Sequence, residues 1–204
     1  MHGRTQAIAR LKQGDLSGLE ALVTQFQAPA VQTAYLIVAD RSLAEDIVQS
    51  AFLKAAERID QFDAQRPFRP WFLRMVVNDC IKAAHRQQRN PSLDEPSSAV
   101  LAWLTDPTPG PEQLVETNEL RQSVWDALQQ LSPEQRAVIV QRHFLEMDEA
   151  EMVRFLHYPP STVKWWLHTG RERLKDLLGP HQNRPFKEYD RVRDQIAGEK
   201  NEKF

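Results

Sequence analysis

The sequence predicts an all-α protein with two small helical domains joined by a flexible acidic linker, the second domain containing a helix-turn-helix. Three observations support this prediction. Apolar residues recur three and four positions apart over most of the chain, which is the spacing of one helical face. A proline-rich stretch interrupts this pattern between residues 91 and 117. Near the C-terminal end, only His157-Tyr158-Pro159-Pro160 separates two helical segments, a break short enough for a helix-turn-helix.

The domain boundaries follow from where the helical pattern stops and resumes. We expect a first domain over 1–90, a linker over 91–117, a second domain over 118–179 and a charged C-terminal extension over 180–204. The linker contains five prolines, and the stretch from Asp94 to Glu119 contains six acidic residues and no lysine or arginine. This composition is typical of a spacer between domains.

Composition and charge exclude several classes of protein. With 204 residues, 41% hydrophobic and 26% charged, the chain has the composition of a globular protein. It lacks a secretory leader pattern and an apolar run of membrane-spanning length, which predicts a cytoplasmic protein without membrane insertion. The formal net charge of −2 argues against a protein that coats nucleic acid unaided. The single cysteine, Cys80, excludes an internal disulfide and is expected to be a buried structural thiol.

Local signals predict where helices begin. Ser17-x-x-Glu20 and Ser42-x-x-Glu45 have the pattern of capping boxes, and Pro29 favours a helix start between them. In the second domain, Ser132-Pro133-Glu134-Gln135 combines an N-cap, a proline at the first helical position and a capping-box partner. Asp148-x-x-Glu151 predicts another capped helix.

A basic helix closes the first domain. Residues 66–89 contain six lysines or arginines against one aspartate. From Trp71 onward, Phe72, Val76 and Cys80 share one helical face, and a second face carries Arg74, Asn78, Lys82, Arg86 and Arg89. Basic side chains beside aromatic rings favour a surface that holds phosphates and stacks on exposed bases. The alternative is an ordinary solvated helix face over core aromatics.

The helix before it has an acidic face. Six acidic residues outnumber three basic ones between Asp40 and Asp63, while Leu43, Ile47 and Ala51 form a buried stripe that Phe52 extends. An acidic face next to a basic helix suggests two different partners.

The last helix, 161–178, is the expected reading helix of the helix-turn-helix. Its outward positions are Ser161, Lys164, Trp165, His168, Arg171 and Lys175, and basic residues outnumber acidic ones four to one from Ser161 to Lys175. Such a helix fits the major groove of DNA. The alternative is an amphipathic helix of a bundle.

Together these features resemble the extracytoplasmic-function (ECF) sigma factors of bacterial RNA polymerase. The most specific stretches are residues 40–52, 62–72 and 131–136, with Ser161-Thr162-Val163-Lys164 as a fourth match. The resemblance covers roughly Leu11 to Leu178. It implies a dissociable subunit that is not an enzyme, binds core polymerase, recognises promoter DNA and promotes strand opening for transcription initiation.

The resemblance also implies site residues. The minus-ten element would contact Phe68, Arg69, Trp71, Arg74, Asn78, Lys82, Arg86 and Arg89. The minus-thirty-five element would contact Ser161, Thr162, Lys164, Trp165, His168, Thr169 and Arg171. The clamp of the largest polymerase subunit would bind Asp40, Glu45, Asp46, Gln49 and Phe52. The flap of the second-largest subunit and an anti-sigma factor are further implied partners, and no cofactor or metal is expected. A free chain with its two domains packed together is another family expectation.

Three departures from the family pattern concern the second domain, one of which is Thr169 in place of a common arginine. Trp165-Trp166 stands where the family usually has a small residue and an arginine, and a tryptophan cannot make the bidentate guanine contact of an arginine. His157 occupies a turn position where glycine is usual.

The main alternative function is a stand-alone helix-turn-helix transcriptional regulator that binds duplex DNA without polymerase. An enzyme has little support, because the sequence has no glycine-rich phosphate loop and its six histidines lack metal-ligand spacing. A protein-only adaptor would leave both basic helices unexplained.

Overall fold

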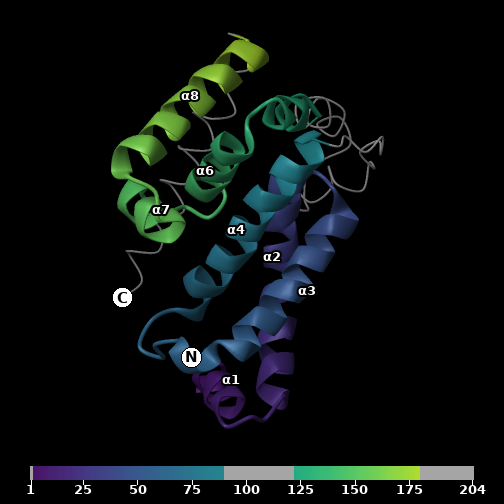
Figure 1. Ribbon diagram of the computed structural model, residues 1–204, viewed down its shortest axis with the longest axis vertical. Coiled ribbons are helices and arrows are strands. Elements are labelled where there is room, and N and C mark those ends of the chain that lie inside the picture. The colour runs from purple at the N-terminus through teal and green to yellow at the C-terminus, as the bar shows by residue number, and fades with distance from the viewer. Residues whose placement is uncertain (1, 90–121, 180–204) are drawn as a thin grey trace, which may run out of the picture.

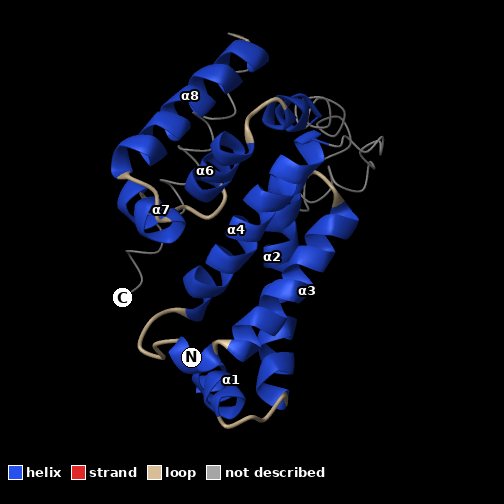
Figure 2. Cartoon of the chain, in the orientation of Figure 1, coloured by secondary structure: helices blue, strands red, loops and turns tan. Residues whose placement is uncertain are grey.

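The computed structural model describes residues 2–89 and 122–179, and its regular elements in these stretches are all helical (Figure 2). The first stretch contains α1 (His2–Lys12), α2 (Ser17–Val38), α3 (Arg41–Glu57), the short 3-10 helix η1 (Ile59–Gln61) and α4 (Phe68–Arg89). The second contains a helix over 122–129, α6 (Pro133–His143), α7 (Glu149–Leu156) and α8 (Pro160–Leu178). The all-α prediction is confirmed, whereas the predicted linker (91–117) and extension (180–204) lie outside the described residues.

The first helical unit is a bundle in which α2, α3 and α4 pack side by side, with α1 across one end (Figure 1). Phenyl rings form the part of its core nearest the start of α4. The Phe72 ring stacks on those of Phe52 and Phe68, with centroids 4.3 and 5.7 Å apart, and Phe62 meets Phe68 edge-on at 5.6 Å. Because Phe68 and Phe72 are 1% and 0% exposed, the first turn of α4 is fixed to this core.

The starts of α2 and α3 differ from the sequence prediction. Leu16 occupies the N-cap position of α2 without a side-chain cap, and the Asp15 carboxylate accepts a hydrogen bond from the Ser17 N–H at 2.9 Å. Asp40 caps α3, where its carboxylate accepts from the Leu43 N–H at 2.9 Å. The capping boxes predicted at Ser17 and Ser42 are therefore wrong. In both cases an aspartate two residues earlier supplies the oxygen, and a carboxylate is also favoured by the helix dipole.

Pro29 does not start a helix, because α2 runs without interruption from Ser17 to Val38. A proline inside a helix leaves the carbonyl four residues earlier without its donor. That carbonyl belongs to Gln25, an exposed residue, so water can replace the missing bond. The remaining length of α2 is held by burial, since Ala30, Ala34 and Ile37 are each 0% exposed.

The second helical unit begins with the local signals that the sequence predicts. Both predicted capping boxes form, Ser132 with Gln135 at α6 and Asp148 with Glu151 at α7. The predicted helix-turn-helix is present as α7 and α8. At the turn between them, His157 has a φ of 58°, the left-handed conformation usually taken by glycine.

Helix α8 packs on α6 and α7 through the residues that its spacing predicts. Val163, Leu167, Leu174 and Leu178 are buried. Gly170 lies so close to α6 that an added Cβ would meet the Ile139 side chain at 3.3 Å. The opposite face of α8 remains on the surface.

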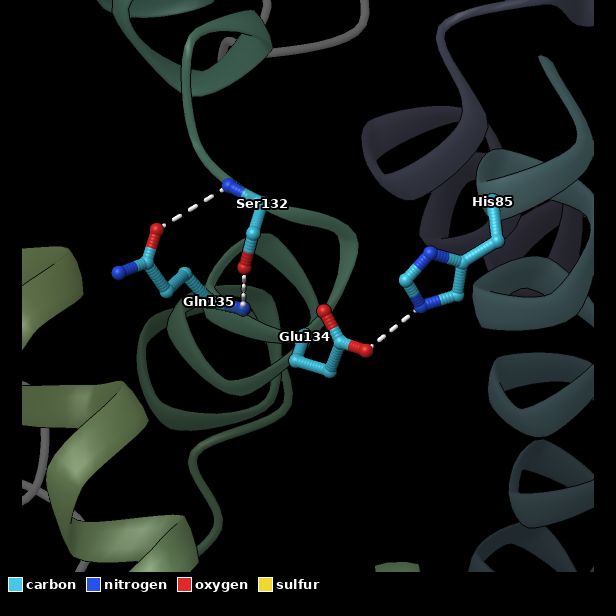
Figure 3. A network of polar contacts seen from close by, with 4 residues as sticks. All are labelled: His85, Ser132, Glu134 and Gln135. Atoms are coloured by element: carbon cyan, nitrogen blue, oxygen red, sulfur yellow. Dashed lines mark hydrogen bonds and ion pairs between the residues drawn. The ribbon is translucent and has the colours of Figure 1, made fainter. Parts of the chain in front are cut away.

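The two units pack against each other through α2, α4 and the helices of the second unit (Figure 1). The Tyr35 ring stacks on that of Trp125, with centroids 4.8 Å apart. Arg136, 7% exposed, donates through Nη1 to the Ile37 carbonyl at 2.7 Å. His85 Nε2 lies 2.6 Å from Glu134 Oε1 (Figure 3). The expectation that the domains pack together is met in this structure.

Arg136 also holds the second unit together at this junction. Three further guanidinium N–H groups donate to the carbonyls of Leu128, Gln129 and Leu131 at 2.8, 2.8 and 3.3 Å. Burial lowers the pKa of Arg136 to about 10, because the neutral carbonyls replace water without supplying a counter-charge.

Candidate nucleic-acid and protein interfaces

Helix α4 presents a basic face, defined here as Arg69, Arg74, Asn78, Lys82 and Arg86. Arg69, Lys82 and Arg86 are exposed, and Arg74 and Asn78 are half-buried. The one aspartate of this helix, Asp79, is engaged by Lys54 of α3 at 2.6 Å and lies 3.6 Å from Lys82. Because Lys54 shares the charge of Asp79, the basic face keeps a positive balance. Arg89, also predicted here, ends α4, and its side chain lies outside the described part of the structure.

The inner face of α4 is apolar, as its spacing predicts. Phe72, Val76 and Cys80 are each 0% exposed. Burial, with a smaller contribution from the neighbouring Asp79 charge, raises the pKa of the Cys80 thiol well above its usual range. A protonated, enclosed thiol is a poor nucleophile, so the prediction of a buried structural cysteine is confirmed.

A cavity of about 700 Å³ lies beside the loop that precedes α4. The side chains of Arg66, Arg69, Trp71 and Arg74 line one wall, and Glu146 and Arg154 contribute to the other. The Trp71 ring packs against Phe62, with centroids 4.9 Å apart, and remains half-buried. Guanidinium groups beside an accessible aromatic ring can hold a nucleotide by its phosphate and its base.

Phe68 was expected at this interface, and its position corrects that expectation. With 1% of its surface exposed, it lies in the phenyl core beneath the loop. Its ring packs against that of Trp71, with centroids 5.6 Å apart.

Helix α3 carries the acidic face. Asp46 and Gln49 are exposed, whereas Glu45 bonds to Arg41 at 2.9 Å and Asp40 is occupied as the N-cap. The family resemblance also implied Phe52 at this face, but its side chain is 5% exposed and stacked on Phe72, so it lies in the buried stripe that the helical spacing predicts.

Leu53 is the residue of this face that sequence reasoning missed. It is 62% exposed and lies seven residues after Asp46 and four after Gln49, so the three side chains share one helical stripe. The sequence did contain a signal for it, because Leu53 is an apolar residue at helical spacing from two polar residues expected on the surface. An exposed leucine between polar groups suits a protein partner.

Helix α8 presents the predicted reading face. Ser161, Lys164, Trp165, His168 and Arg171 are exposed, and Thr162 and Thr169 are half-buried. Lys164 lies 3.6 Å from Glu149 at the start of α7. The Thr169 hydroxyl is held internally, since it accepts from Gln135 Nε2 at 3.0 Å and donates to the Trp165 carbonyl at 2.8 Å.

The two adjacent tryptophans of α8 have different environments. Trp166 is half-buried and meets the Tyr158 ring edge-on at 4.8 Å, so it supports the turn between α7 and α8. Trp165 is 59% exposed. The predicted sites thus gather on three separate surfaces, on α4 with its loop, on α3 and on α8.

Comparison with known families matches both units. The family Sigma-70 region 2 matches residues 22–90, and the family Sigma-70, region 4 matches residues 121–174. The chain is 28% identical to the ECF RNA polymerase sigma factor SigW of Bacillus subtilis over 84% of this chain and 94% of that protein. It is 26% identical to the ECF RNA polymerase sigma-E factor of Escherichia coli over 85% and 93%.

The chain belongs to the ECF sigma factors. Region 2 of this ECF sigma factor therefore includes α3, α4 and most of α2, and region 4 includes α6, α7 and most of α8. The fold is shared with CnrH, solved in complex with the cytosolic domain of CnrY. That similarity has a TM-score of 0.59 at 22% identity and covers 86% of this chain and 97% of the other. Among the described residues, no helix is long and apolar enough to cross a membrane.

Proposed function

We propose that this ECF sigma factor binds core RNA polymerase as a dissociable subunit, recognises two promoter elements and promotes strand opening. The observation that supports this best is the presence of three distinct interfaces on one chain. The acidic face on α3 suits a protein partner. The basic face on α4, with its adjacent cavity, suits a melted DNA strand, and the exposed reading face on α8 suits duplex DNA. The chain acts as an initiation factor without catalytic activity of its own, in the cytoplasm where the polymerase works.

In the minus-ten interaction, the basic face of α4 neutralises strand phosphates. Arg69, Lys82 and Arg86 are exposed for this role, and Arg74 connects the face to the cavity. An unstacked base can enter the cavity beside Trp71, where ring stacking replaces the stacking lost from the duplex. Binding the separated strand more tightly than the duplex shifts the equilibrium toward the open promoter.

In the minus-thirty-five interaction, the first turns of α8 enter the major groove. Ser161, Lys164, Trp165 and His168 are presented to base edges, and Arg171 lies one turn further along for a phosphate. Thr169 acts as a positioning residue, because its hydroxyl ties α8 to Gln135 of α6.

In the polymerase interaction, Asp46, Gln49 and Leu53 form the docking stripe for the clamp of the largest subunit. The polar pair gives orientation, and the leucine supplies apolar area. Region 4 contacts the flap of the second-largest subunit.

An anti-sigma factor is a further proposed partner. CnrH was solved with CnrY, and the sigma factor RpoE of Bartonella quintana was solved with the anti-sigma factor NepR. A stand-alone helix-turn-helix regulator would have no use for a region 2 unit with an acidic face on α3 and a basic face on α4, so it is not favoured.

The polymerase interaction can be tested by affinity for bacterial core RNA polymerase, comparing wild type with Asp46→Ala/Gln49→Ala. We expect the double variant to bind at least about tenfold more weakly, because both side chains are exposed and contribute little to folding. Glu20→Ala/Gln27→Ala removes one acidic residue and one glutamine from exposed positions on α2 and should bind like wild type. Equal affinity of all three proteins would contradict the proposed docking stripe.

A further inference from the structure

The exposed side of α8 has Trp165 at its centre. Ser161, Trp165 and His168 form one line at helical spacing, directly opposite the buried Val163, Leu167 and Leu174. Three cations, Lys164, Arg171 and Lys175, lie along one flank of this line. An indole at the centre of the face and cations beside it would place the ring over base edges and the cations near phosphates.

The backbone that carries Trp165 is held in place. The Thr169 hydroxyl donates to the Trp165 carbonyl at 2.8 Å and accepts from Gln135 Nε2 at 3.0 Å. The other amide atom of Gln135, Oε1, accepts from the Ser132 N–H at 3.1 Å (Figure 3). The backbone position of Trp165 is therefore coupled to the N-cap of α6, and less backbone freedom is lost on binding.

Trp165 contributes little to the fold. At 59% exposure it contrasts with its neighbour Trp166, which packs on Tyr158. A rigid aromatic side chain left largely in water at the middle of a reading face is available for an apolar contact with DNA.

The chemistry of this face selects among the four bases. An indole has an apolar face and a single N–H donor. Thymine presents a 5-methyl group beside the O4 acceptor in the major groove, whereas guanine presents two acceptors that suit arginine and adenine a donor–acceptor pair that suits asparagine or glutamine. The first two turns of α8, Pro160–Leu167, contain no arginine, asparagine or glutamine. Their one cation, Lys164, lies 3.6 Å from Glu149.

We propose that Trp165 determines upstream specificity by packing on the 5-methyl group of a thymine in the minus-thirty-five element. This inference rests on the proposed sigma function. It predicts that promoters of this factor carry a thymine at one fixed upstream position, on the strand that faces α8.

The test uses full-length protein assembled with bacterial core RNA polymerase. Promoters are first selected from a duplex pool randomised upstream, and each upstream thymine is then replaced singly by deoxyuridine, which removes only the methyl group. We expect one replacement to weaken holoenzyme binding by roughly fourfold, the effect of losing one buried methyl contact. Trp165→Ala should bind the thymine and deoxyuridine promoters equally, and Trp165→Arg should shift selection toward guanine at that position.

Asp176→Ala serves as the control, because Asp176 is exposed near the C-terminal end of α8, outside the reading face, and the variant should keep the discrimination between thymine and deoxyuridine. Equal wild-type binding to thymine and deoxyuridine at every upstream position would overturn the inference, as would discrimination that survives Trp165→Ala. Weaker binding of Trp165→Ala to core polymerase with unchanged promoter selection would assign the indole to a protein contact and also overturn it. Failure of the wild type to bind core polymerase would contradict the proposed sigma function itself. This outcome is distinct from those that overturn the role of Trp165.

Discussion

Helices α4 and α8 have similar sequence patterns but place their aromatic residues in opposite ways. In α4 the phenyl rings at 68 and 72 are 1% and 0% exposed, and the cations lie over them beside a cavity. In α8 Trp165 is 59% exposed at the centre of the outward face. The α4 rings therefore hold the helix in place, so that its basic face and the adjacent cavity can bind a separated DNA strand. The Trp165 ring of α8 is itself available for a contact with DNA. Basic residues near aromatic ones indicate nucleic-acid binding. The burial of each side chain then decides whether that side chain can contact the nucleic acid.

The largest expected effect tests the role of the α4 rings. Phe72→Ala removes a ring that stacks on both Phe52 and Phe68, and we expect a loss of about 3–5 kcal/mol in the free energy of unfolding. Denaturant unfolding followed by circular dichroism measures it. A loss below about 1 kcal/mol would mean that this cluster does not anchor α4.

The next effect concerns the junction between the two units. Arg136→Ala removes the guanidinium bonds to the carbonyls of Ile37 and Leu128, with an expected loss of about 2–4 kcal/mol. Arg136→Lys should recover only part of it, because a single ammonium group cannot reach the same set of carbonyls. Unfolding of both variants measures the difference, and full recovery by lysine would show that charge alone matters.

The pH dependence at the same junction gives a spectroscopic test. Burial, and secondarily the Asp40 charge, raise the pKa of Tyr35 to about 12. Between pH 10 and 12 the unfolded chain ionises this phenol while the folded chain keeps it protonated, so Tyr35 lowers stability as pH rises through that window. Absorbance titration should show a tyrosinate step near pH 12 that is absent in Tyr35→Phe. A titration curve of Tyr35→Phe identical to that of the wild type would contradict the burial of the Tyr35 phenol.

A smaller effect is expected at the side-chain hydrogen bond between Gln135 of α6 and Thr169 of α8. Thr169→Val keeps the shape of the side chain but removes the hydroxyl that contacts Gln135 and the Trp165 carbonyl. We expect a loss of about 1 kcal/mol in the free energy of unfolding. Thr24→Val is a suitable control, because the Thr24 hydroxyl bonds only to the Glu20 carbonyl on an exposed part of α2. Equal losses at both positions would show that the hydrogen bond between Gln135 and Thr169 adds no stability beyond that of a local hydroxyl bond within a helix.

The smallest effect completes the comparison of the two helices. Trp165→Ala should change the free energy of unfolding by less than about 0.5 kcal/mol, because the ring is mostly in water. The same denaturant experiment applies. A loss similar to that of Phe72→Ala would show that the indole supports the fold and is not available to DNA.

Some local features of the fold were predictable from sequence, although the capping boxes expected at Ser17 and Ser42 do not form. Features that depend on distant contacts were not predictable. The capping boxes at Ser132 and Asp148 and the break at His157 form as expected because each depends on neighbouring residues. Pro29 inside α2 was not foreseen, since the burial that holds that helix together comes from other elements. The bond between Arg136 and Ile37 joins residues 99 positions apart, and no periodicity reveals it.

The candidate sites were predictable to the extent that helical spacing separates inside from outside. Spacing placed Asp46, Gln49 and the outward residues of α8 correctly on the surface. The family resemblance assigned Phe52 and Phe68 to interfaces, but both side chains lie in the core, as the spacing had indicated for Phe52.

The most direct test of the central claim is run-off transcription with bacterial core RNA polymerase on promoters selected by the holoenzyme, with permanganate detection of unpaired thymines. The account predicts specific transcripts and an open minus-ten region with wild type. With Arg74→Ala/Lys82→Ala it predicts that the polymerase is bound and the duplex stays closed. Specific binding of the chain alone to duplex DNA, with neither core binding nor strand opening, would contradict it.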